Sequence, residues 1–128
     1  SDETLPPQRI LVAEDNSVNA QVTEQMLRNL GHEVVVAENG EAVMARWQQG
    51  FDLILMDCLM PVMDGYTAAR RIRSLEHETG QRIPIIALTA NTMNEEREKC
   101  VAAGMDDFLA KPVRLRQLND ALRRQLAS

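Results

Sequence analysis

Several features are scarce in this sequence of 128 residues, and each absence excludes a class of protein. Two cysteines, Cys58 and Cys100, are too few for a disulfide framework, so a reduced, cytoplasmic setting is expected. No apolar run approaches the roughly 20 residues that cross a bilayer, and there is no signal-peptide pattern. The net charge of −5 leaves no basic surface to neutralise nucleic-acid phosphates. We therefore expect no nucleic-acid partner and no direct membrane contact, in a parent protein that is cytoplasmic or anchored in the inner membrane.

The length and the 45% content of hydrophobic residues suit one domain with a buried core. Residues 1–8 are mostly polar, and Pro6-Pro7 favours an extended backbone, which predicts a linker. The folded domain is then expected over residues 9–128.

Short apolar runs alternate with segments of helical period along this domain. Each run is almost continuous, which is typical of a strand buried on both faces of a parallel sheet. The runs cover residues 10–13, 34–36, 53–56, 85–88 and 108–110. The segments between them are long enough to be helical crossovers. The pattern predicts an α/β fold of the flavodoxin-like type, a doubly wound five-stranded parallel sheet, and this fold class implies the strand order 2-1-3-4-5.

Apolar spacing and capping residues predict how the helices begin, end and pack. Gly31 and Gly104 are expected to stop the first and fourth helices, and Asp64 to cap the third. Thr92 and Glu95 have the spacing of a capping box. The predicted apolar stripes are Val18, Val22, Met26 and Leu30 in the first helix, Ala68, Ile72 and Leu75 in the third, and Leu115, Leu118, Leu122 and Leu126 in the last.

Other polar and sulfur-containing residues are assigned ordinary structural roles. His32 and His77 are expected to be solvated, and Arg70, Arg71 and Arg73 to form a solvated helix face. Cys58 is expected to be a small packed residue rather than a reactive thiol.

Polar side chains stand where the strands end. Glu14 and Asp15 follow the first strand, Asp57 the third, Thr89 the fourth and Lys111 the fifth. In the predicted strand order these ends are neighbours, so the five side chains should converge on one crevice. Any one of them could be a helix cap or turn residue. All five together favour a functional site.

Three carboxylates in one crevice repel one another. Two charges about 4 Å apart at an effective dielectric near 20 cost roughly 4 kcal/mol. A bound hard cation or a raised pKa on one acid relieves this repulsion, and a small set of oxygen ligands suits Mg²⁺. Lys111 can neutralise a transferred phosphoryl group and Thr89 can donate a hydrogen bond to it. The residues therefore favour phosphoryl transfer, which depends on positioning and charge neutralisation.

Five motifs in this order resemble the response-regulator receiver family, over about residues 8–126. They are residues 11–16 (LVAEDN), 55–57 (LMD), 60–65 (MPVMDG), 88–90 (LTA) and 111–112 (KP). The resemblance implies that Asp57 is the phosphorylated aspartate. It implies that Glu14 and Asp15 hold Mg²⁺ together with Asp57 and the backbone carbonyl of Leu59.

The resemblance also implies a switch pair, Thr89 and Phe108, and a role for Lys111 in binding the phosphoryl oxygens beside a cis peptide to Pro112. Phe108 stands where tyrosine is also common in the family. Leu59 stands where polar residues are frequent, which bears on how fast the phosphoryl group is lost.

The function implied is transfer of a phosphoryl group from phosphohistidine onto Asp57, followed by relay or a conformational switch. Residues 60–65 with Asn16 and Asn19 look like receivers of hybrid sensor histidine kinases. The implied partner is a kinase dimerisation domain or a histidine phosphotransfer domain. We expect it to dock on an apolar patch at the mouth of the crevice, with Asn19 and Val113 as contacts and Val22 in the core.

Four alternative functions make different demands on these residues. A stand-alone response regulator acting by protein–protein interaction needs the same site. A phosphatase of the haloacid dehalogenase type needs a second Asp at the position of Leu59 as general acid. A flavin-binding protein needs an acid-free phosphate loop where Glu14 and Asp15 stand. A degenerate receiver does not need the intact acids, Thr89 and Lys111. Whether the domain counts as an enzyme is left open, because the phosphoryl acceptor is its own Asp57.

Overall fold

Strands and helices alternate strictly in the computed structural model, which describes residues 5–126. The elements are β1 (Arg9–Ala13), α1 (Ser17–Asn29), β2 (Glu33–Ala37), α2 (Gly40–Arg46), β3 (Leu53–Asp57), α3 (Gly65–Thr79), β4 (Ile85–Thr89), α4 (Asn94–Ala102), β5 (Asp107–Ala110) and α5 (Leu115–Leu126). The strands form one parallel sheet in the order β2-β1-β3-β4-β5. The predicted flavodoxin-like fold and strand order are confirmed.

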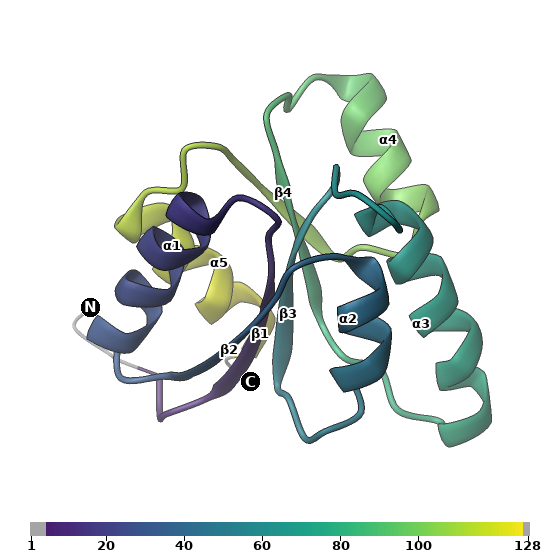
Figure 1. Ribbon diagram of the computed structural model, residues 1–128, viewed down its shortest axis with the longest axis horizontal. Helices are drawn as coiled ribbons and strands as arrows, with labels where there is room; N and C mark the ends of the chain where they lie inside the picture. Colours follow the sequence, from purple (N-terminus) through teal and green to yellow (C-terminus); the bar gives the residue numbers. More distant parts are fainter. Residues whose placement is uncertain (1–4, 127–128) are drawn as a thin grey trace.

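Helices cover both faces of the sheet, with α1 and α5 on one side and α2, α3 and α4 on the other (Figure 1). This arrangement explains why β3 and β4 are buried at every position. Alternate residues of β3 face opposite layers, since Leu53 and Leu55 belong to the core under α1 and α5 whereas Ile54 and Met56 belong to the other core. Burying each such side chain contributes about 1.5–3 kcal/mol, which explains the near-continuous apolar runs.

Several predicted helix ends are confirmed. Gly31 and Gly104 follow α1 and α4 with φ values of 95° and 92°, a left-handed conformation that glycine adopts at little cost. Asp64 caps α3, because its side chain accepts the N–H of Thr67 at 2.8 Å.

The predicted capping box of α4 is wrong. The residue at the N-cap is Met93, whose side chain makes no capping hydrogen bond. Asn91 Oδ1 instead accepts the N–H of Met93 at 2.9 Å, so an asparagine turn before the helix replaces the box. Thr92 offers its carbonyl oxygen to Arg97 Nε at 3.0 Å. Of the nine residues of α4, Cys100 alone is buried.

The predicted core face of α1 is wrong in its first half, although Met26 and Leu30 do pack against the core as predicted. Val18 and Val22 are 65% and 48% exposed, and the buried residues of the helix are Ala20, Thr23 and Leu27. The helix turns by about 100° per residue, so a strict four-residue spacing drifts by about 40° at each step around the helix axis. The same kind of error affects α3 and α5, where Leu75 and Leu115 are 40% and 46% exposed.

Two residues expected in solvent are enclosed. His32 is buried and its Nδ1 accepts the N–H of Gln8 at 3.0 Å, while burial lowers the pKa of its imidazole. Arg73 does not lie on the solvated face predicted for α3, because its guanidinium donates to Glu76 and Asp106, each at 2.7 Å. Arg70, Arg71 and His77 are exposed as expected.

Part of the predicted linker lies outside the described residues, as do the last two residues of the predicted domain. In the described part, Leu5 packs against the core under α1 and α5, and the carbonyl of Gln8 accepts the N–H of Glu33 at 2.9 Å. The boundary at residues 8 and 9 stays a prediction. Within residues 5–126, no helix has both the length and the apolar composition needed to cross a bilayer.

Candidate functional site

A cavity of about 330 Å³ opens at the carboxyl ends of the central strands. All five side chains singled out from the sequence line it: Glu14 and Asp15 after β1, Asp57 at the end of β3, Thr89 at the end of β4, and Lys111 after β5. They come from four strands because the carboxyl ends of parallel strands share one edge of the sheet. The structure therefore brings the predicted residues together in one crevice.

The three acids lie close enough to share a cation. Glu14, Asp15 and Asp57 each offer a carboxylate oxygen, and these oxygens lie within 4.8 Å of one another. Glu14 and Asp57 are buried, whereas Asp15 is exposed at the mouth. Carboxylate oxygens on a partly open crevice fit Mg²⁺, which takes few protein ligands and keeps several waters.

The ammonium group of Lys111 lies close to both buried carboxylates. Lys111 Nζ lies 2.6 Å from Asp57 Oδ2 and 3.3 Å from Glu14 Oε1. The other oxygen of Asp57 accepts the N–H of Leu59 at 3.2 Å. The carboxylate of Asp57 is thus oriented from two sides.

Burial and neighbouring charge shift the titration of this crevice. Burial raises the pKa of Glu14 to about 7, and the hydrogen bond and charge of Asp57 add to the effect. Burial alone would lower the pKa of Lys111, but the hydrogen bond and charge of Asp57, with the charge of Glu14, outweigh it and raise that pKa. The raised pKa of Glu14 is one of the two remedies expected for crowded carboxylates.

Two glycines allow the loop after β3 to lie against the crevice. A Cβ atom on Gly65 would overlap the carbonyl oxygen of Asp57. The N–H of Gly40 donates to the carbonyl of Met63 at 3.0 Å, and a Cβ on Gly40 would come within 2.7 Å of Met63 Cβ. At the loop tip Val62 has a φ of 68°, unusual for a β-branched residue. Close backbone packing therefore fixes the segment that carries Leu59.

The two residues of the predicted switch lie on the paired strands β4 and β5, where Phe108 is opposite Ala87 and Thr89 is opposite Ala110. The hydroxyl of Thr89 lines the crevice but donates to the carbonyl of Asn91 at 2.9 Å. Phe108 is half-buried and does not line the crevice; its ring lies under the guanidinium of Arg97, 4.6 Å from centroid to Cζ. The peptide between Lys111 and Pro112 is cis.

Comparison with known protein families identifies the family to which the chain belongs. Residues 10–123 match the family described as the response regulator receiver domain. The chain belongs to this family. It is a receiver domain of two-component signal transduction, which is the family that the sequence motifs resemble.

The chain matches only a part of a longer curated relative. Histidine kinase 5 of Arabidopsis thaliana is 42% identical in a match that covers 97% of this chain and 16% of that protein. The chain thus spans less than a fifth of the length of this curated relative.

The solved structures that are similar to this receiver include two other receiver domains. The receiver domain of the sensor histidine kinase PA1611 from Pseudomonas aeruginosa, with a magnesium ion in its active-site cleft, is 49% identical, with a TM-score of 0.84 over 96% of this chain and 100% of that chain. The receiver domain of Ssk1 from Saccharomyces cerevisiae, crystallised with the histidine phosphotransfer protein Ypd1, is 31% identical, with a TM-score of 0.92 over 97% and 92% of the two chains.

Sequence reasoning missed two residues that line the receiver's crevice, Tyr66 and Glu96. The hydroxyl of Tyr66 on α3 donates to the carboxylate of Glu96 on α4. Burial, followed by the hydrogen bond to Glu96, raises the pKa of this phenol, so it remains a donor. Neither residue belongs to a motif quoted above, and they lie 30 positions apart, so no local pattern links them.

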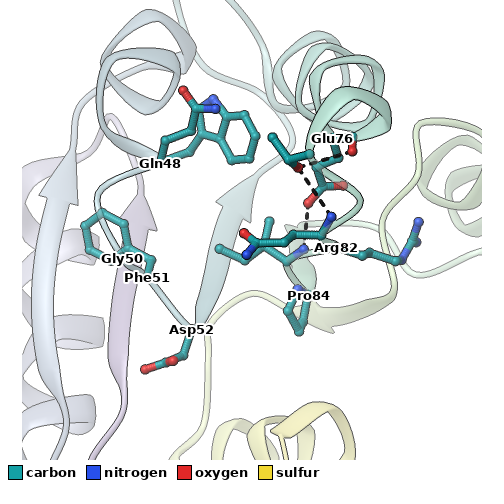
Figure 2. A pocket seen from close by; sticks show the side chains of 11 residues that line it. Gln48, Gly50, Phe51, Asp52, Glu76, Arg82 and Pro84 are labelled. Carbon is teal, nitrogen blue, oxygen red and sulfur yellow. Dashed lines mark hydrogen bonds between the residues drawn. The ribbon is translucent and has the colours of Figure 1, made fainter.

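A larger cavity, about 570 Å³, lies at the opposite end of the sheet. Figure 2 shows Gln48 and Phe51 on one of its walls and Glu76 and Arg82 on the other. The carboxylate of Glu76 is already bound by the N–H of Ile83 at 2.6 Å and by Arg73. The groups that suit phosphoryl chemistry therefore lie in the smaller crevice.

Next to that crevice is an open surface formed by α1 and the segment after β5. A cavity of about 380 Å³ there is lined by Asn19, Val22, Pro112 and Val113, among others. The two residues predicted to contact a partner, Asn19 and Val113, lie on the same surface, and Val22 joins them instead of entering the core.

Proposed function

We propose that this receiver accepts a phosphoryl group from phosphohistidine on the carboxylate of Asp57, with Mg²⁺ held by Glu14, Asp15 and Asp57. One observation carries the proposal: three carboxylates with oxygens within 4.8 Å of one another share a crevice with the ammonium of Lys111, 2.6 Å from Asp57. A helix cap or a turn does not need this combination of groups.

The reaction exchanges one bond to phosphorus for another. An oxygen of Asp57 attacks the phosphorus, the bond from phosphorus to the histidine nitrogen breaks, and an acyl phosphate forms. Bound Mg²⁺ supplies charge neutralisation for the phosphoryl oxygens, with the backbone carbonyl of Leu59 as a further ligand. Lys111 turns from the carboxylate to the phosphoryl oxygens, and the hydroxyl of Thr89 leaves Asn91 to donate to them.

The phosphodonor is a helical histidine-bearing protein. A histidine phosphotransfer domain or a kinase dimerisation bundle would present its histidine over the mouth, where Asp15 is exposed. The surface of Asn19, Val22, Pro112 and Val113 is apolar with an amide beside it, which suits a transient helical partner. The similarity to the receiver crystallised with Ypd1 supports this choice.

The parent protein is a hybrid histidine kinase in which residues 1–8 are a linker and the receiver faces the cytoplasm. The relative quoted above is a histidine kinase that the chain matches over a small share of its length, which supports the parent. The free, buried thiols of Cys58 and Cys100 suit a reducing compartment.

Labelling with acetyl phosphate tests the site without any docking partner. We expect one phosphoryl group per chain, detected by intact-protein mass spectrometry, with Mg²⁺ and none with EDTA. Asp57→Asn should abolish labelling, and the control Asp120→Asn, at an exposed position on α5, should retain it. Labelling of a Ser, Thr or His, or labelling that persists in EDTA, would contradict the proposal.

A further inference from the structure

We propose that the first turn of α4 senses the charge in the crevice through Glu96 and transmits it to the ring of Phe108 through Arg97. Glu96 and Arg97 are then positioning residues that act on the phosphorylated state without touching the reacting atoms. The inference rests on the proposed function, because it concerns how occupation of the crevice is communicated to the surface.

The first half of the connection is Glu96. Its carboxylate lines the same cavity as Asp57 and accepts the hydroxyl of Tyr66. Tyr66 lines this cavity together with Cys58, the residue that directly follows Asp57. Lys99 Nζ is 3.8 Å from Glu96 Oε1, too far to neutralise it strongly at the surface. A negative charge therefore stands in the wall of a crevice that must receive an anion.

The second half is Arg97, the next residue of the helix. Its guanidinium lies 4.6 Å from the centre of the Phe108 ring, and its Nε donates to the carbonyl of Thr92 at 3.0 Å. Successive helical residues point about 100° apart, so one turn contacts the crevice with Glu96 and the ring with Arg97. A movement of this turn must change both contacts together.

The proposal requires two arrangements of this turn. In the structure, Glu96 accepts the hydroxyl of Tyr66 and Arg97 covers Phe108. A phosphoryl group adds further negative charge beside Glu96, and like charges repel more strongly in a partly dry cavity than in water. Since Cys100 is the one buried residue of α4, little buried surface opposes a shift of its first turn.

The alternative is that the contacts of Glu96 with Tyr66 and of Arg97 with Phe108 have a purely structural role and hold α4 in place. NMR spectroscopy distinguishes the two, because the protein has only two phenylalanines, Phe51 and Phe108. Phe51 is an internal control: it is covered by Arg9 at 4.3 Å in the same way, but lines the cavity at the opposite end of the sheet. The probe is BeF₃⁻ with Mg²⁺, which mimics a phosphoryl group on a carboxylate.

In the wild type we expect BeF₃⁻ to shift the Phe108 ring resonances and to leave those of Phe51 in place. Glu96→Gln keeps an oxygen for Tyr66 but removes the charge. It should bind BeF₃⁻ about three- to tenfold more tightly, with a smaller Phe108 shift. The matched control Glu95→Gln removes an equal charge from the same turn outside the crevice and should behave as the wild type.

Arg97→Gln tests the second half separately. Loss of the contact with the ring should move the Phe108 resonances of the free protein toward their bound positions and strengthen BeF₃⁻ binding about two- to fivefold. A purely structural role predicts lower thermal stability with unchanged BeF₃⁻ affinity. Equal affinities and equal Phe108 shifts in Glu96→Gln and Glu95→Gln would overturn the inference. If the wild type itself shows no saturable, Mg²⁺-dependent BeF₃⁻ binding, the proposed function fails first.

Discussion

The ammonium group of Lys111 donates to Asp57 across 2.6 Å, although the two residues lie 54 positions apart in the chain. The same ammonium is also 3.3 Å from Glu14, so one positive charge is shared by two buried carboxylates. This shortage of positive charge is what a bound cation would correct, and it makes the crevice sensitive to pH.

Magnesium affinity should rise with pH up to neutrality. The folded pKa of Glu14 is raised from 4.5 to about 7, so this acid is mostly protonated below pH 7 and must lose its proton to bind the metal. Each unit of pH below 7 should weaken Mg²⁺ binding up to about tenfold, with a plateau above. Calorimetric titrations at several pH values measure this. Glu14→Gln should bind weakly with little pH dependence, and a flat profile in the wild type would contradict the assignment of Glu14.

Docking should be separable from chemistry. Asn19→Asp with Val113→Asp places two charges on the surface beside the crevice, and should slow transfer from a phosphohistidine protein at least tenfold while sparing labelling by acetyl phosphate. Val101→Asp is the control, because Val101 is equally apolar and 73% exposed but lies on α4. Rapid-quench kinetics with each donor provides the comparison. Equal slowing with both donors would mean that the damage is to the site or the fold.

Arg73 should be a major contributor to stability. Besides its ion pairs with Glu76 and Asp106, it donates to the carbonyls of Gly104 and Ile83, both at 2.8 Å. Arg73→Met keeps much of the side-chain volume but leaves two carboxylates without this partner, so the free energy of unfolding should fall by about 3 kcal/mol. Arg71→Met, at an exposed neighbour, should change it by less than about 0.5 kcal/mol. Urea denaturation followed by circular dichroism measures both, and similar losses would refute the role of the network.

Gly65→Ala should damage the site as well as the fold. Its new methyl group would overlap the carbonyl oxygen of Asp57 and push this residue out of place, so Mg²⁺-dependent labelling should fall at least tenfold. Gly80→Ala is the matched control: it meets open space but has a φ of 73°, so it should cost about 1 kcal/mol of stability and leave labelling unchanged. Equal labelling of the two variants would show that the loop tolerates the displacement.

The sequence predicted the sheet and the crevice because both follow from local patterns. Near-continuous apolar runs identify strands covered on both faces, and the residue after such a run is placed at the carboxyl edge whatever the details of packing. With the strand order that the fold class implies, Asp57 and Lys111 could therefore be brought together without knowledge of any side-chain contact.

What could not be predicted depends on partners that are distant in sequence. Arg73 reads as one of several arginines on a helix, and its burial depends on Asp106, 33 positions away. His32 reads as a polar residue after a glycine, and its burial depends on the N–H of Gln8. The prediction for Val22 failed for another reason. Residues spaced by four shift steadily around the helix axis, so the spacing alone does not say which of them face the sheet.

The attachment of α4 has a consequence for how the receiver opens. A helix that buries Cys100 alone has less burial to resist local unfolding than α3, which buries five residues. Its amide protons should exchange with solvent through subglobal fluctuations, while those of β3 and β4 exchange only when the whole domain unfolds. We therefore expect the strand that carries Asp57 and helix α4 to belong to different cooperative units, so that α4 can unravel and re-form while Asp57, Glu14 and Lys111 stay together.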